Sequence, residues 1–170
     1  EEDEGFVVKQ LDGDATRGTL EVTAFGRTRT YVNATSLHAD LGTGNDYLVI
    51  DPSVKVPVYV TGGDGDDILI HQGTGAAVIS GNGGADYVES AGVTATLDGN
   101  EGDDFLVYNG SGTATIRGGI GADVLRGGPG NDVLQGGDGD DDIAGRGGAD
   151  QIDAGVGADL VQLTFGNLAS

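Results

Sequence analysis

A nine-residue pattern recurs nine times between Leu41 and Gln162 and restricts the fold more than any other feature of the sequence. Each copy runs small residue, glycine-like residue, any residue, glycine, any residue, aspartate, any residue, aliphatic residue, any residue. The sixth position is aspartate in every copy, at Asp46, Asp67, Asp86, Asp104, Asp123, Asp132, Asp141, Asp150 and Asp159. The eighth is aliphatic in every copy, at Leu48, Leu69, Val88, Leu106, Leu125, Leu134, Ile143, Ile152 and Val161. Agreement at both positions in all nine copies identifies a true internal repeat.

The spacing of the copies gives the size of the structural unit. From residue 118 onward the copies follow every 9 residues, whereas the earlier starts are 21, 19, 18 and 19 residues apart. An aliphatic residue also stands two places before each of the next four motif starts, at Val60, Ile79, Leu97 and Ile116. Each early interval therefore contains a second strand whose acidic turn has been lost. We predict coils of about 18 residues with two short strands and two turns.

The glycines and the small core predict an all-β stack. Six residues with two to four glycines make a turn that ordinary side chains cannot follow, and the next three alternate outward, inward, outward as a short strand. Glycine accounts for 34 of the 170 residues, and only 5% are aromatic. Stacked coils with strands ~4.8 Å apart need only a thin core of single aliphatic residues. A chain with few large apolar side chains can therefore still form a folded core.

The charge of the chain excludes several classes of partner. Eight Lys and Arg residues stand against 28 Asp and Glu residues, which gives a net charge of −20. Such a chain repels nucleic acids and anionic membranes, and no stretch is apolar enough to span a bilayer. The absence of cysteine excludes a disulfide framework and a thiolate zinc site. We therefore expect that the chain binds neither nucleic acid nor a membrane, and that it is a monomer.

The repeat resembles the RTX, or hemolysin-type, calcium-binding nonapeptide, over residues 41–162. The resemblance implies a right-handed parallel β-roll with calcium between adjacent turns, in a protein secreted by bacteria through the type I route. The second-position glycine is replaced at Asn82, Asn100 and Arg146, and the first-position glycine at Leu41 and Ala154. The aspartates are intact, so these departures affect turn geometry more than calcium binding.

Calcium is the ion that suits these turns. Sixth-position carboxylates one coil apart repel each other, and a hard divalent cation between them reverses that term. Calcium accepts six to eight carboxylate and carbonyl oxygens in irregular geometry, which magnesium tolerates poorly. We expect the ligands to be the nine sixth-position aspartates together with neighbouring turn residues. The turn residues are Gly44, Asn45, Gly63, Asp64, Gly65, Asp66, Gly83, Gly84, Glu101, Gly102, Asp103, Gly119, Gly121, Gly128, Gly130, Asn131, Gly137, Asp138, Gly139, Asp140, Gly147, Gly148, Gly155 and Gly157.

Pairing neighbouring turns predicts about seven calcium ions. Seven aspartates on one edge allow six sites, and Asp132 with Asp150 on the other edge allows one. Seven Ca²⁺ would move the charge from −20 to about −6, which is ordinary for a soluble domain. The metal-free chain is glycine-rich, acidic and poor in aromatic residues, a signature of disorder. We therefore expect binding to be coupled to folding where calcium is plentiful, outside the cell.

The repeat divides the chain into three parts. We expect residues 1–40 to form one or two capping coils without calcium motifs, or alternatively a separate small β element, and residues 163–170 to form a C-terminal tail. The two histidines, His38 and His71, have no evident partners and are expected at the surface.

No catalytic motif is evident, so we expect a non-catalytic module of a larger protein that contacts its neighbouring domains. The sequence lacks a complete EF-hand loop, the His-Glu-x-x-His zinc motif and the Gly-x-Ser-x-Gly elbow. An alternative function rests on an outward-facing apolar stripe formed by Tyr47, Ile68, Tyr87, Phe105 and Val124 with Val49, Ile70 and Val107. Such a stripe suits a module that recognises a glycan or a protein in an adhesin or a polysaccharide-acting enzyme, although strand propensity alone also accounts for it.

Overall fold

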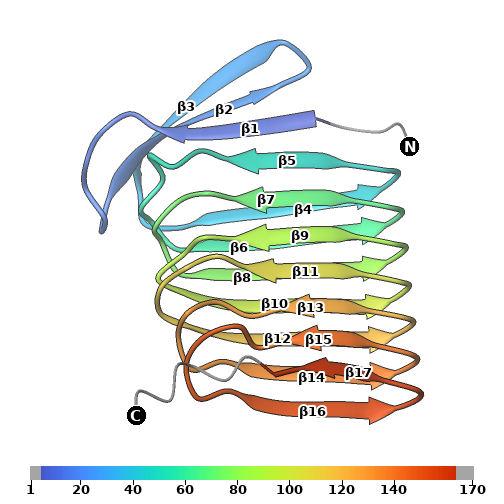
Figure 1. Ribbon diagram of the computed structural model, residues 1–170. Coiled ribbons are helices and arrows are strands. Elements are labelled where there is room, and N and C mark those ends of the chain that lie inside the picture. Colours follow the sequence, from blue (N-terminus) through green and yellow to red (C-terminus); the bar gives the residue numbers. More distant parts are fainter. Residues whose placement is uncertain (1–4, 164–170) are drawn as a thin grey trace, which may run out of the picture.

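The computed structural model describes residues 5–163, and every helix or strand assigned within them is a β-strand (Figure 1). The strands are β1 (Gly5–Gln10), β2 (Gly18–Ala24), β3 (Arg27–Ala34), β4 (Leu37–Thr43), β5 (Tyr47–Ile50), β6 (Val58–Asp64), β7 (Ile68–His71), β8 (Ala77–Gly83), β9 (Tyr87–Ser90), β10 (Thr94–Glu101), β11 (Phe105–Tyr108), β12 (Thr113–Ile120), β13 (Val124–Arg126), β14 (Val133–Asp138), β15 (Asp142–Ala144), β16 (Gln151–Val156) and β17 (Leu160–Gln162).

From β4 onward the strands alternate between two parallel sheets. The odd-numbered strands β5 to β17 belong to a ten-stranded sheet, sheet A, and the even-numbered strands β4 to β16 form a seven-stranded sheet, sheet B. Each strand pairs in parallel with the strand one coil away, as Leu48 with Leu69 and Leu106 with Leu125. Figure 1 shows the resulting ladder of coils. The predicted all-β parallel solenoid is confirmed.

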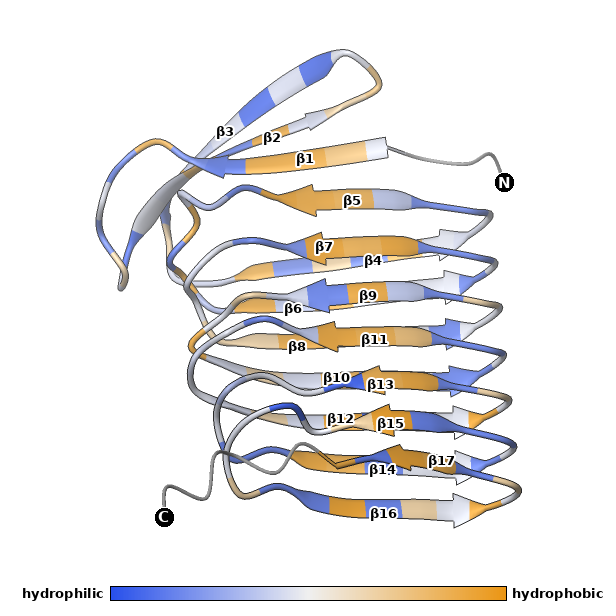
Figure 2. Cartoon of the chain, viewed as in Figure 1, coloured by the Kyte–Doolittle hydropathy of each residue, from blue (hydrophilic) through white to orange (hydrophobic). Residues whose placement is uncertain are grey.

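The core is one layer of aliphatic side chains from each sheet. Sheet A contributes the eighth motif position of the first-edge copies up to Ile143. Sheet B contributes the aliphatic residue of the second strand of each coil (the half-coil), which at Leu134 is also an eighth motif position. These residues are at most 4% exposed at Leu48, Leu69, Val88, Leu106, Leu125, Ile143, Val60, Ile79, Leu97, Ile116 and Leu134. Figure 2 shows hydrophobic bands at these strands and hydrophilic turns between them. The predicted half-coils are thus confirmed, and the core is as thin as the composition requires.

The connections between the sheets form two edges with different chemistry. The first edge consists of the short acidic turns from sheet B to sheet A, at 44–46, 65–67, 84–86, 102–104, 121–123, 139–141 and 157–159. The second edge consists of the returns from sheet A to sheet B, at 51–57, 72–76, 91–93, 109–112, 127–132 and 145–150. Only the last two of these returns carry the motif.

Buried polar side chains fill the second edge where acidic turns are missing. His71 and Ser90 pair in register on neighbouring strands, and the His71 Nδ1 lies 3.0 Å from the Ser90 hydroxyl. The Tyr108 hydroxyl donates to the Gly92 carbonyl at 3.0 Å and accepts the Gly112 amide at 3.1 Å. The expectation that His71 is a surface residue was therefore wrong. It is fully buried because it continues the strand alternation one step beyond the motif, and burial lowers its pKa to about 4.

The N-terminal strands do not continue the coils, so the expectation of capping coils in residues 1–40 was wrong. β1 extends sheet A by parallel pairing with β5, but β2 and β3 then pair antiparallel. The reason is local: Phe25 and Gly26 both have positive φ and reverse the chain in a tight hairpin. β4, within the same range, already belongs to sheet B. The alternative of a small β element describes β1–β3 better, although it remains attached to sheet A.

The stacked glycines of the first edge predict that one added methyl group strongly lowers the free energy of unfolding. Gly121 has φ +136°, and a Cβ there would collide with the Gly102 carbonyl of the previous coil. Gly121→Ala is expected to lower the free energy of unfolding by at least about 2 kcal/mol. Gly5→Ala, where a Cβ meets no atom within 4 Å, should change it by less than about 0.5 kcal/mol. Urea denaturation with saturating calcium measures both, and equal midpoints for the two variants would contradict the close packing of the turns.

Candidate metal centre

The first edge carries a column of aspartates linked by hydrogen bonds along the stack. The amide of Asp86 donates to Oδ1 of Asp104 at 2.8 Å, and the amide of Asp104 donates to Oδ1 of Asp123 at 2.8 Å. The same bond joins Asp46 to Asp67, Asp67 to Asp86, Asp123 to Asp141, and Asp141 to Asp159. All seven predicted first-edge aspartates therefore belong to one continuous ladder. These carboxylates are also nearly inaccessible, from Asp46 to Asp141.

The second oxygen of most first-edge carboxylates has no hydrogen-bond partner within residues 5–163. Oδ2 is buried and without a hydrogen bond in Asp67, Asp86, Asp104, Asp123 and Asp141. A buried ionised oxygen without a partner is costly, so such an atom calls for a cation or a proton. Because these oxygens occur once per coil, one cation or proton is needed between each pair of adjacent turns.

The first-position glycines make room for these oxygens and are site residues that the sequence does not predict. A Cβ at Gly62, Gly81, Gly99, Gly118 or Gly136 would collide with Oδ2 of the aspartate five residues later. The sequence signal for this role is the first glycine of the motif, which turn geometry alone also explains.

The predicted turn residues lie around this column on the first edge. Glycines at the second and fourth positions stack directly on the carbonyls of the previous coil, as Gly65 on Gly44 and Gly84 on Gly65. The stacked glycines of the first edge are Gly44, Gly63, Gly65, Gly84, Gly102, Gly119, Gly121, Gly137, Gly139, Gly155 and Gly157. Carbonyl groups from successive coils therefore lie close to one another near the carboxylates, as a calcium site requires.

The variable turn residues have mixed roles. Oδ1 of the fifth-position residue accepts the amide of the next coil's fifth residue, as from Ala85 to Asp66 at 2.8 Å. Asn45, Asp103, Asn131 and Asp140 do the same. Third-position carbonyls accept an amide from the previous coil, at Asp64, Gly83, Glu101 and Asp138. Because a carbonyl has two lone pairs, each keeps one for a further ligand.

The second edge also brings Asp132 and Asp150 together, but there the carboxylate oxygens of Asp132 already accept hydrogen bonds. The Asp132 amide donates to Oδ1 of Asp150 at 2.9 Å, which reproduces the ladder bond. Both oxygens of Asp132, however, already accept amides, Oδ1 from Ala114 and Oδ2 from Gly128. The other predicted residues of this edge, Gly130, Asn131, Gly147 and Gly148, lie in the same two turns. The demand for a cation is therefore weaker here than on the first edge.

Burial raises the pKa values of the ladder carboxyls. The pKa of Asp104 rises to about 7, and those of Asp86 and Asp123 rise to about 6. Loss of solvent is the largest cause, neighbouring carboxylates add to it, and the amide hydrogen bond opposes it. Asp67 and Asp141 shift in the same direction. These are the groups whose charge a bound cation would restore.

The donor set fits calcium and does not fit a side-chain-only metal site. No group of three or more acidic or histidine side chains that could hold a metal occurs within residues 5–163. Two carboxylate oxygens per interval therefore need several carbonyls to complete a coordination shell. Calcium accepts that mixture, whereas zinc favours nitrogen and sulfur ligands. The residues present thus fit a calcium ion between adjacent first-edge turns.

The raised pKa values predict that mild acid makes folding less dependent on calcium. A raised pKa in the folded state makes low pH stabilise the metal-free fold, and that stability is lost as pH rises through about 6 to 7. The unfolded chain and the calcium-bound fold are both ionised from about pH 5.5 to about pH 8, so acid favours only the metal-free fold. In EDTA, residual β-structure should therefore be greater at about pH 5.5 than at about pH 8, and the calcium concentration at half-folding should be no higher at about pH 5.5. Circular dichroism measures both, and residual β-structure in EDTA that is no greater at the lower pH would contradict the burial of these carboxylates.

Comparison with known proteins agrees with this chemistry. Residues 108–143 and 127–161 match the family model of the RTX calcium-binding nonapeptide repeat, with 4 copies. No curated protein and no solved structure matches the chain. The described residues contain no helix long and apolar enough to cross a membrane. The earlier coils stack in register with the matched ones in both sheets, β11 on β13 in sheet A and β10 on β12 in sheet B. Residues 108–161 are therefore similar to RTX calcium-binding nonapeptide repeats of the hemolysin type.

Proposed function

We propose that the chain is a calcium-gated folding element: it folds when calcium fills the first edge and serves as a structural, folding-assisting module of a protein secreted by the type I route. RTX repeats are structural calcium-binding modules, and proteins that carry them are generally extracellular. The observation that carries the proposal is the set of five buried oxygens without hydrogen-bond partners, Oδ2 of Asp67, Asp86, Asp104, Asp123 and Asp141. The neighbouring domains of the parent protein are its expected partners.

Electrostatics explain why folding would wait for calcium. Two unit charges ~4.8 Å apart repel by about 1 kcal/mol in water and about 3.5 kcal/mol at an effective dielectric constant of 20. Seven carboxylates stand in one column, in a chain of net charge −20. A divalent ion between each pair turns this repulsion into attraction. Outside the cell, calcium is abundant enough for modules with dissociation constants of about 10⁻⁴ to 10⁻³ M.

The proposed ligands are those expected from the sequence, and the first edge is proposed to bind calcium more tightly than the second. Six intervals between seven first-edge aspartates hold six ions, and Asp132 with Asp150 holds the seventh. Because Asp132 is already satisfied by two amides, the seventh ion is the weakest. First-position glycines support the ladder by admitting Oδ2, and second- and fourth-position glycines supply carbonyls.

A calcium titration monitored by far-UV circular dichroism tests whether calcium triggers folding. The EDTA-treated chain is expected to lack most β signal and to gain it cooperatively as calcium reaches about 1 mM. Magnesium at the same concentration should produce less than about a tenth of the change, because it sheds water reluctantly. A chain that is fully folded in EDTA would show that calcium does not gate folding.

Substitution within the ladder tests the pairing of sites. Asp104 borders two intervals, so Asp104→Asn should lower the number of tightly bound calcium ions by up to two and raise the calcium midpoint at least about threefold. The amide keeps an Oδ1 acceptor for Asp86, so only the charge is lost. Asp153→Asn removes the same charge from β16, away from both edges, and should leave the count unchanged. Equal counts for both variants, measured by native mass spectrometry, would contradict ladder coordination.

A recognition module remains the second candidate, because the outer face of sheet A carries the predicted apolar stripe. Tyr47, Ile68, Tyr87 and Phe105 pair in register, and the Tyr87 and Phe105 rings stack at 5.5 Å. Tyr47, Ile68 and Phe105 are 39–45% exposed. Val107 differs from expectation because it is buried, in register between the longer side chains of Glu89 and Arg126. The stripe is thus narrower than predicted.

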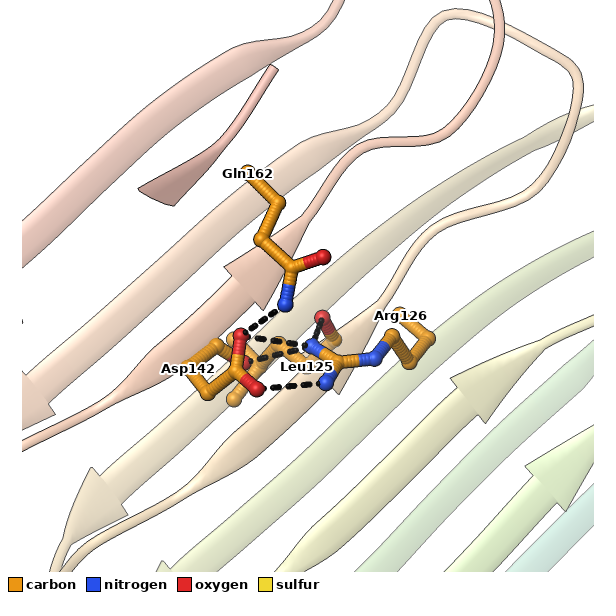
Figure 3. A network of polar contacts seen from close by, with 4 residues as sticks. All are labelled: Leu125, Arg126, Asp142 and Gln162. Atoms are coloured by element: carbon orange, nitrogen blue, oxygen red, sulfur yellow. Dashed lines mark hydrogen bonds and ion pairs between the residues drawn. The ribbon is translucent and has the colours of Figure 1, made fainter. Parts of the chain in front are cut away.

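A polar network ends the stripe in the later coils (Figure 3). Arg126 forms a two-pronged ion pair with Asp142, at 2.7 Å to Oδ2 and 3.2 Å to Oδ1. Gln162 donates to the same Asp142 Oδ1 at 2.7 Å, and Arg126 holds the pKa of Asp142 below its ordinary value. The apolar stripe is therefore interrupted at Asp142, which lies in register between Val124 and the exposed Leu160.

A binding screen separates the two candidates. If the stripe recognises a ligand, Tyr47→Ser, Tyr87→Ser and Phe105→Ser should each weaken binding at least about tenfold to whichever member of a panel of soluble oligosaccharides binds the wild type. Tyr59→Ser, on the outer face of sheet B and 42% exposed, is the matched control. The absence of any binding from the whole panel, in saturating calcium, would leave glycan recognition without support.

A further inference from the structure

Sheet A continues further than sheet B at the N-terminal end of the stack. Beyond β5, sheet A adds β1, β2 and β3, whereas sheet B ends at β4. Figure 1 shows these three strands beyond the last rung of the roll. Their inner faces therefore look onto space that a strand of sheet B occupies everywhere else in the stack.

That space is an apolar hollow of about 590 Å³. Phe6 and Val22 line it from sheet A, and Leu37 and Leu41 line it from β4. It opens directly from the core, because the buried Leu48 is also in its wall. The walls contain a single charged side chain, Asp40. A hollow of this size and polarity is unusual at the end of a soluble stack unless something fills it.

The free edge of β4 runs along the hollow and specifies a polypeptide as its occupant. β6 is the only strand of the described chain that pairs with β4. The Leu37 amide donates to Pro57 before β6, so the alternate residues His38 and Asp40 direct their main-chain groups to the free edge. An unpaired edge is a template for an added strand, which supplies main-chain hydrogen bonds while alternate side chains enter pockets.

Charge specifies the occupant further. Arg27 and Arg29 of β3 line an adjoining hollow of about 290 Å³, which shares Phe6, Val22 and Tyr31 with the larger one. Residues 5–34 contain four basic and three acidic side chains, a net charge of +1 in a chain of −20. Tyr31 and Val32 are 50% and 70% exposed, so apolar surface beside these arginines is also uncovered. The site thus favours an acidic partner, and a second copy of this acidic chain is disfavoured by repulsion of the rolls.

We infer that β4 and the adjoining hollow bind one extended segment of a partner polypeptide, which adds a strand to sheet B, places alternate apolar side chains in the hollow and sets carboxylates beside Arg27 and Arg29. β4 has seven residues, so the segment presents three or four side chains to the hollow. This docking function is separate from the calcium sites, which lie on the first edge.

A synthetic peptide tests the inference on the calcium-saturated chain. The probe has eight residues that alternate valine and threonine, followed by two glutamates. Fluorescence anisotropy should show saturable binding. The same peptide with N-methylated alternate amides, which cannot pair with a strand edge, should bind at least about tenfold more weakly. A lysine-ended peptide should also bind at least about tenfold more weakly at low salt. Equal affinity for the N-methylated peptide, or no binding of the first probe, overturns the inference.

Matched variants locate the site. Asp40→Pro removes an edge amide and should weaken binding at least about tenfold, whereas Asp40→Ala keeps the amide and should not. The double variant Arg27→Glu, Arg29→Glu lies on exposed positions and should reverse the preference between the two peptides. Circular dichroism in calcium checks that each variant folds. Equal binding by Asp40→Pro and Asp40→Ala, or dimerisation that protects the β4 amides without peptide, contradicts this occupant.

Discussion

The central coils of this molecule bury a first-edge aspartate whose carboxylate must satisfy two demands at once. Oδ1 accepts the amide of the aspartate one coil earlier and so sets the spacing and register of the turns. Oδ2 lies beside the first-position glycine and has no hydrogen-bond partner within residues 5–163 in Asp67, Asp86, Asp104, Asp123 and Asp141. A buried charge of this kind is tolerated only if it is protonated or paired with a cation. With a pKa of about 7, Asp104 can meet this requirement by protonation at mildly acidic pH, whereas above that pH it needs a cation, which we propose is calcium.

The turns of the two edges are held by different kinds of side chain. On the first edge, acidic turns repeat in every coil, and their buried oxygens call for a cation or a proton. On the second edge, the early returns use neutral buried groups: His71 bonds the Ser90 hydroxyl, and the Tyr108 hydroxyl bonds the main chain. Those bonds need no metal, so the early second edge stabilises the roll independently of calcium. The later returns, with Asp132 and Asp150, resume the acidic form but with more of their oxygens already bonded.

Most of the roll could be predicted from the sequence because one residue type occupies one environment in every coil. The sixth-position aspartates and the aliphatic core positions follow from period alone, and the half-coils follow from Val60, Ile79, Leu97 and Ile116. The antiparallel cap could not be predicted, because β1–β3 alternate like any strands and only their antiparallel pairing in the structure distinguishes hairpins from coils. Likewise, burial of His71 depends on one further step of strand alternation past the motif. Residue-level calcium ligation remains a prediction.

Hydrogen exchange at the ladder amides tests the central claim most directly. The amides of Asp67, Asp86, Asp104 and Asp123 donate to the carboxylates that calcium is proposed to pair. At about pH 7.5, where the raised pKa values leave most of these carboxylates ionised, the account predicts fast exchange of these amides in EDTA and strong protection in calcium. Protection that is equally strong in EDTA at that pH would show that the ladder holds without a cation, and would contradict calcium as the ion that closes the roll.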